Sequence, residues 1–89
     1  MVEQTRKQRL ANAYVSCRET MVENGASENG IARISDIMLA SIRTLDFLWD
    51  STSGDSLDYV LDQIIYQFAS VAAHETGLNK DDIYVKLLL

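Results

Sequence analysis

Apolar residues recur every three or four positions along almost the whole chain, and this spacing limits what the chain can fold into. The two clearest runs are Leu10, Tyr14, Cys17 and Met21, and then Leu57, Leu61, Ile64, Phe68 and Val71. Such spacing places side chains on one face of an α-helix, whereas a half-buried strand would alternate them. No proline interrupts the pattern. The sequence therefore predicts an all-α fold.

Glycines mark the expected ends of the helices, because glycine readily adopts the left-handed conformation that closes a helix. They occur at Gly25, Gly30, Gly54 and Gly77, which divides the chain into three long segments and a short tail. We expect Gly25 to close the first helix. The next helix then follows a short turn, in which Ser27 or Asn29 accepts hydrogen bonds from its first amides.

A polar stretch, residues 51–55, separates the second and third predicted helices. Asp55 or Ser56 is the expected N-cap of the third helix, since short polar side chains accept hydrogen bonds from the free amides of a first turn. Gly77 is expected to end this helix.

The tail after Gly77 carries two conflicting patterns. Asn79 followed by Asp81 and Asp82 places acceptors and negative charge where a helix N-terminus favours them. The run 83–85 is β-branched and aromatic, which is typical of a strand. We favour a short helix, and residues 83–87 are the part of the chain for which the sequence leaves helix and strand both open.

The second predicted helix, roughly residues 31–49, is apolar around much of its circumference. Its apolar residues are Ile31, Ile34, Ile37, Met38, Ile42, Leu45, Leu48 and Trp49. Because one antiparallel neighbour covers a single stripe, we expect this helix to lie centrally and to contact several neighbours. The chain is thus predicted to form one domain over residues 1–89, a small antiparallel bundle of three main helices plus a short C-terminal helix.

Three features predict that the chain associates into a homodimer. The second helix has more apolar surface than one neighbour covers. The chain also ends in the apolar run 87–89, which would fray in water and is expected to lodge in a groove of its own chain or of a second subunit. The charge is also divided unevenly: residues 1–45 contain six Lys or Arg and five Asp or Glu, whereas residues 46–89 contain two and eight. A two-fold arrangement would set the cationic start of one chain against the acidic third helix of the other.

Charge and hydropathy exclude two classes of partner. With a net charge of −5, the chain lacks the surplus of cations that displaces counterions from nucleic-acid phosphates, so generic nucleic-acid binding is not expected. The longest apolar run, residues 37–40, is far shorter than the roughly 20 residues that span a bilayer. The first ten residues lack the apolar core of a secretion signal, and we expect a cytoplasmic protein that does not bind membranes.

Few residues could support catalysis. His74 is the only histidine, and Ser70 precedes it by four residues on the same predicted face, a pairing that is common by chance. Cys17 lies within the apolar stripe of the first helix, which favours a buried small hydrophobic side chain over a reactive thiol. We predict no catalytic residues and no enzymatic activity.

The segment from Asp50 to Leu61 has some of the residues of a calcium-binding loop. Its glycine, Gly54, falls at the fifth loop position rather than the sixth, and Leu61 occupies the place of the bidentate glutamate. A solvated connection between helices is the better interpretation. We therefore predict neither a metal site nor a cofactor.

Carboxylates and tyrosines gather around the third helix, in a set that we call the acidic/tyrosine face. It comprises Asp46, Asp50, Asp55, Asp58, Tyr59, Asp62 and Tyr66. No Lys or Arg occurs between Arg43 and Lys80, so this end of the molecule is expected to have a negative field with aromatic side chains inside it. Such a surface suits a basic protein partner, because complementary charge speeds encounter and tyrosines supply contact energy. The alternative is a solvated face that only keeps the protein soluble.

Cations gather at the start of the chain, at Arg6, Lys7, Arg9 and Arg18. Symmetric association could bring copies of these residues together into an anion site for a phosphate-containing small ligand. They could instead pair with the acidic half of a neighbouring subunit. The leading hypothesis is a small non-enzymatic interaction or regulatory protein, such as an inhibitor, that uses the acidic/tyrosine face. The phosphate-ligand binder is the alternative.

Overall fold

The computed structural model describes residues 6–48 and 54–88, and of residues 46–48, 54 and 55 only the backbone. In these ranges the chain forms four helices and no strand. The helices are α1 (Arg6–Glu23), α2 (Glu28–Leu48), α3 (Gly54–Thr76) and α4 (Lys80–Leu88). The predicted bundle of three main helices and a short C-terminal helix is confirmed.

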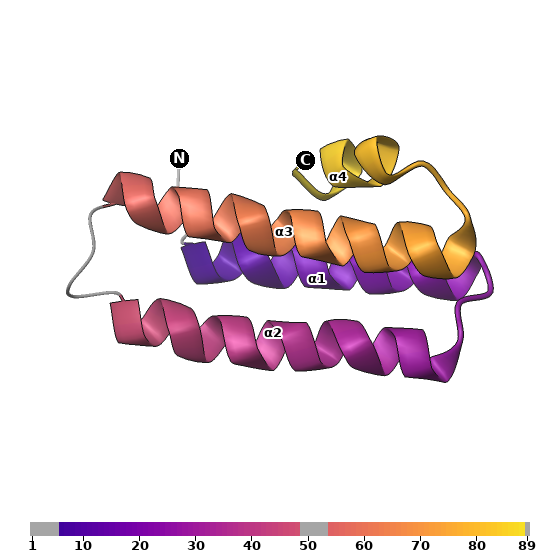
Figure 1. Cartoon of the computed structure of the whole chain (residues 1–89), viewed down its shortest axis with the longest axis horizontal. Helices are drawn as coiled ribbons and strands as arrows, with labels where there is room; N and C mark the ends of the chain where they lie inside the picture. Colours follow the sequence, from indigo (N-terminus) through magenta and orange to yellow (C-terminus); the bar gives the residue numbers. More distant parts are fainter. Residues whose placement is uncertain (1–5, 49–53, 89) are drawn as a thin grey trace.

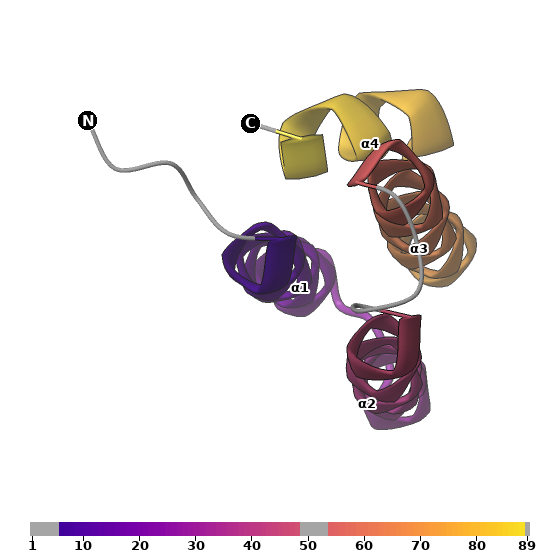
Figure 2. The same cartoon turned by 90° about the vertical axis from the view of Figure 1, so that its left-hand side faces the viewer.

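The three long helices run alternately up and down, so that α1 and α3 point the same way and α2 runs against both (Figure 1). Viewed along the bundle, they lie at the corners of a triangle, and α4 folds back over α3 and α1 (Figure 2). No helix in the described ranges combines the length and the apolar character that crossing a membrane requires.

The turn between α1 and α2 forms as the sequence predicts. Gly25 has a φ of 76°, and the amides of Gly25 and Ala26 donate to the carbonyl oxygens of Val22 and Met21 at 3.3 and 2.9 Å. These two bonds satisfy the last free carbonyls of α1, as in a Schellman motif. The Oγ of Ser27 accepts a hydrogen bond from the amide of Gly30 at 3.1 Å, so Ser27 is the N-cap of α2.

The turn between α3 and α4 is built in the same way, with a glycine that ends one helix and a side chain that caps the next. Gly77 has a φ of 77°, and its amide donates to the carbonyl oxygen of Ala73 at 2.8 Å. The Oδ1 of Asn79 accepts a hydrogen bond from the amide of Asp82 at 3.1 Å, which caps α4. The tail is therefore a helix, as favoured, and the strand alternative is wrong.

Two predicted helix starts are wrong by a few residues. α2 begins at Glu28 rather than near Ile31, because the cap at Ser27 sets its first turn. α3 begins at Gly54, so Asp55 and Ser56 lie within its first turn and neither is the N-cap. Most of the predicted polar loop, together with Trp49, lies outside the described residues.

The central helix is α3, and the prediction that the second helix lies centrally is wrong. α2 packs against α1 and α3, whereas α1 and α3 each pack against all three other helices. Of these two, α3 contributes more of the buried apolar side chains. Its buried side chains are Leu57, Leu61, Ile64, Ile65, Phe68, Ala69 and Ala72. The small side chains of Ala69 and Ala72 widen the buried face of α3 beyond the single stripe seen in the sequence.

α2 lies at the edge of the bundle, although the apolar residues predicted for it do pack against the core. Ile34 and Leu45 are fully buried, and the four other described apolar residues of the predicted set are partly buried against the core. Leu39 is 58% exposed. α2 therefore anchors the bundle by one stripe and leaves part of its apolar surface uncovered.

Candidate interaction site

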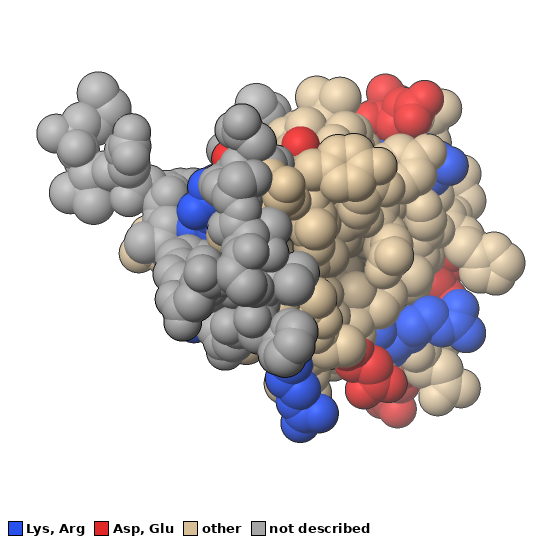
Figure 3. Space-filling view, turned by 60° about the vertical axis from the view of Figure 1, so that its left-hand side comes forward, with Lys and Arg blue, Asp and Glu red and all other residues tan. Residues whose placement is uncertain are grey.

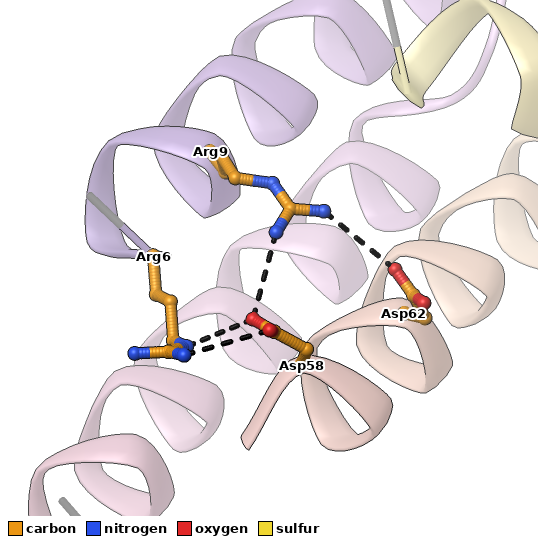
Figure 4. Close-up of polar contacts among 4 residues, drawn as sticks. All are labelled: Arg6, Arg9, Asp58 and Asp62. Atoms are coloured by element: carbon orange, nitrogen blue, oxygen red, sulfur yellow. Dashed lines mark hydrogen bonds and ion pairs between the residues drawn. The ribbon is translucent and has the colours of Figure 1, made fainter. Parts of the chain in front are cut away.

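The best-defined polar constellation joins the starts of α1 and α3. Asp58 and Asp62 lie one helical turn apart on α3 and face Arg6 and Arg9 on α1 (Figure 4). The Nε of Arg6 donates to Oδ1 of Asp58 at 2.8 Å, and its Nη2 lies 3.5 Å from Oδ2 of the same carboxylate. Arg9 bridges the two acids, with Nη1 3.6 Å from Oδ1 of Asp58 and Nη2 3.8 Å from Oδ1 of Asp62. We call these four residues the arginine–aspartate cluster.

The cluster is held at the surface rather than in the core. The side chains of Asp58 and Asp62 are each 46% exposed, and those of Arg6 and Arg9 are 28% and 38% exposed. The hydrogen bond from Arg6 lowers the pKa of Asp58 below its usual value, and the charges of Arg6 and Arg9 act in the same direction. The carboxylate of Asp58 is therefore ionised at neutral pH and has one side occupied by guanidinium groups.

Tyr59 is the most exposed large hydrophobic side chain of the described residues, at 67%. It lies on α3 between the two aspartates in sequence and one turn before Asp62, so that the ring and that carboxylate are neighbours on the helix surface. An exposed aromatic ring beside carboxylates supplies contact area that a partner can cover.

Tyr66 occupies a different setting, which the sequence did not reveal. Its ring meets that of Tyr84 from α4 edge to face, with centroids 5.4 Å apart, and the Nζ of Lys80 lies 4.7 Å from its centroid. A hydrogen bond with Tyr66 raises the pKa of Lys80 above its usual value. Tyr66 thus helps to dock α4 against α3, and 36% of it remains exposed. The clustering depends on how α4 folds back, which local spacing does not specify.

The rest of the predicted acidic/tyrosine face cannot be placed in this way. Asp50 lies outside the described residues, as do the side chains of Asp46 and Asp55. The structure therefore brings together Asp58, Tyr59 and Asp62, with Tyr66 one to two turns further along α3.

The four cations of the predicted anion site lie on two faces of α1. Arg6 and Arg9 face α3, where they bind carboxylates. Lys7 and Arg18 are eleven residues apart, close to three full turns, and share an exposed face of α1. Within one chain, these cations do not converge.

This pairing also removes one argument for a homodimer. The cationic start of the chain was expected to meet the acidic third helix of a second copy, but the same pairs form within one chain. On the face shown in Figure 3, acidic and basic side chains are interspersed around a broad uncharged surface rather than separated into two halves. Of the terminal leucines, Leu87 is buried in the core of its own chain, which is one of the two places predicted for the apolar end, while Leu88 is 46% exposed.

The side chains considered for catalysis in the sequence are Cys17, Ser70 and His74. Cys17 is fully buried; its Sγ donates to the carbonyl oxygen of Phe68 at 3.5 Å, and burial raises its pKa to about 11. The thiol is therefore protonated at neutral pH, which agrees with its prediction as a buried small side chain. The Oγ of Ser70 donates to the carbonyl oxygen of Tyr66 at 3.0 Å, a bond within its own helix, and His74 is exposed.

In the described parts of the chain, no group of three or more His, Cys, Asp or Glu side chains is placed to hold a metal ion. The segment compared with a calcium loop includes residues 50–53, which lie outside those parts. Comparison with protein-family models, with curated proteins and with solved structures finds no match to this chain.

Proposed function

We propose that this chain is a small non-enzymatic interaction or regulatory protein, such as an inhibitor, that binds the basic surface of a protein partner. The binding surface is the start of α3. The observation that carries the proposal is Tyr59, 67% exposed and flanked by two carboxylates that each keep 46% of their surface open to solvent. A ring that a partner can cover, surrounded by charge that attracts basic side chains, supplies both contact energy and orientation.

The rigidity of the platform supports the same proposal. α3 packs against all three other helices, as α1 does, so the exposed side chains project from a helix that is held on several sides. A backbone fixed in this way loses less conformational freedom when a partner binds than a mobile loop would.

The phosphate-ligand alternative gains no such support. Arg6 and Arg9 already bind carboxylates, and Lys7 and Arg18 lie on another face of α1. Self-association as a homodimer and a cytoplasmic location stay predictions from the sequence.

Replacing both Asp58 and Asp62 by Asn tests the proposal. This double variant should capture much less of a basic partner from native cell lysate than the unmodified chain does. The capture that remains should depend less on salt, because the attraction is electrostatic. The melting temperature should fall by less than about 5 °C, since exposed ion pairs contribute little to stability. Affinity capture at several salt concentrations, with a thermal melt of each protein, measures both effects.

The matched control is Glu19→Gln with Asp36→Asn, which removes two negative charges from exposed positions on α1 and α2. This control should capture as much partner as the unmodified chain. Equal capture by the control and by the Asp58/Asp62 variant would rule out the start of α3 as the binding surface.

A further inference from the structure

The arginine–aspartate cluster places two cations of the chain on the carboxylates that a basic partner would use. Arg6 and Arg9 are three residues apart on α1, and they reach two aspartates that are four residues apart on α3. The cluster thus shows, within one molecule, how a helix with two arginines one turn apart contacts this acidic pair (Figure 4).

We propose that the first turn of α1 is an internal competitor for the partner, and that the partner presents its own arginines one helical turn apart. This inference rests on the proposed function, because it describes how the same surface is regulated and what it recognises. A partner that brings guanidinium groups to Asp58 and Asp62 must replace Arg6 and Arg9 or share the carboxylates with them.

The two arginines are held to different degrees. The nearest contact, from Nε of Arg6 to Oδ1 of Asp58, is a charge-assisted hydrogen bond of 2.8 Å, whereas both contacts of Arg9 are longer, at 3.6 and 3.8 Å. The loosely held Arg9 is the first to be displaced, and Arg6 then retains the tighter hold on Asp58. Because exposed ion pairs of this kind are weak, the competition changes affinity moderately rather than blocking binding.

The test is a binding titration with a synthetic probe, an alanine-rich helical peptide with arginines spaced three residues apart. Arg6→Gln with Arg9→Gln should bind this peptide about threefold to tenfold more tightly than the unmodified chain, as expected for the loss of two exposed ion pairs. A peptide of the same composition, with its arginines distributed around the helix, should show a smaller gain. Fluorescence anisotropy at low salt reports each dissociation constant.

The charge-matched control is Arg33→Gln with Arg43→Gln, which makes the chain more acidic by the same amount through two exposed positions on α2. Its gain in affinity measures the effect of net charge alone. An Arg6/Arg9 variant that gains no more than this control, while binding still requires Asp58 and Asp62, would overturn the competitor and leave the proposed function standing. Binding that ignores Asp58 and Asp62, or no binding by any variant, would overturn the proposed function and the competitor with it. Equal gains with both peptides would overturn the one-turn spacing.

Discussion

Replacing Ile34 by Asp should abolish cooperative folding. Ile34 is fully buried on α2 and forms part of the core cluster shared with α1 and α3. A carboxylate at this position would lose its hydration without gaining a partner, at a cost of roughly 5 kcal/mol or more. That is comparable with the whole stability of about 5–10 kcal/mol expected for a domain of this size.

Thermal unfolding followed by circular dichroism measures this effect. Leu39→Asp, five residues further along α2 at a position that is 58% exposed, is the matched control and should change stability by less than about 0.5 kcal/mol. A melt of the Ile34 variant near that of the unmodified chain would show that α2 does not pack as described.

Replacing Phe68 by Ala should destabilise the bundle by about 3–5 kcal/mol, the usual range for removing a buried aromatic ring. Phe68 is fully buried at the centre of α3, where its ring meets that of Tyr14 from α1 edge to face at 6.2 Å. The melting temperature should fall by about 12 °C or more.

The control for this substitution is Tyr59→Ala, which removes an aromatic ring of similar size from an exposed position on the same helix. Chemical denaturation of both variants compares their free energies of unfolding directly. If the two variants were equally stable, α3 would not be the helix around which the core is built.

The local features of the fold could be predicted from the sequence because they depend on neighbouring residues. Helical spacing identified the buried faces of α1 and α3, and Gly25 and Gly77 take the left-handed conformation expected at helix ends. Asn79 and the aspartates after it outweighed the strand-forming residues 83–85, since a side-chain cap satisfies amides that a lone strand would leave unpaired.

Which helix lies at the centre of the bundle could not be predicted, because it depends on tertiary packing. Both α2 and α3 have wide apolar surfaces, but α4 packs against α3 and α1 and leaves α2 at the edge of the bundle. Ala69 and Ala72 belong to the second buried stripe of α3, but alanine is also common on exposed helix surfaces and does not by itself indicate such a stripe.

The arginine–aspartate cluster could have been predicted in outline. In a bundle of alternating helices the first and third run in the same direction, so their starts lie at the same end of the molecule. That topology alone brings the cations of residues 6–9 close to the aspartates of residues 58–62 within one chain, whereas from the sequence we paired them only between two copies. The side-chain contacts themselves, and the docking of Tyr66 against Tyr84, required the structure.

Chemical-shift mapping shows whether basic partners bind at the start of α3. The backbone amide resonances of the chain are followed by NMR while the arginine peptide is added. We expect saturable shifts that are largest around residues 57–63 and residues 6–10, where the partner meets the carboxylates and competes with Arg6 and Arg9. Saturable shifts centred on another surface, or no saturable shifts at all, would contradict binding at the start of α3.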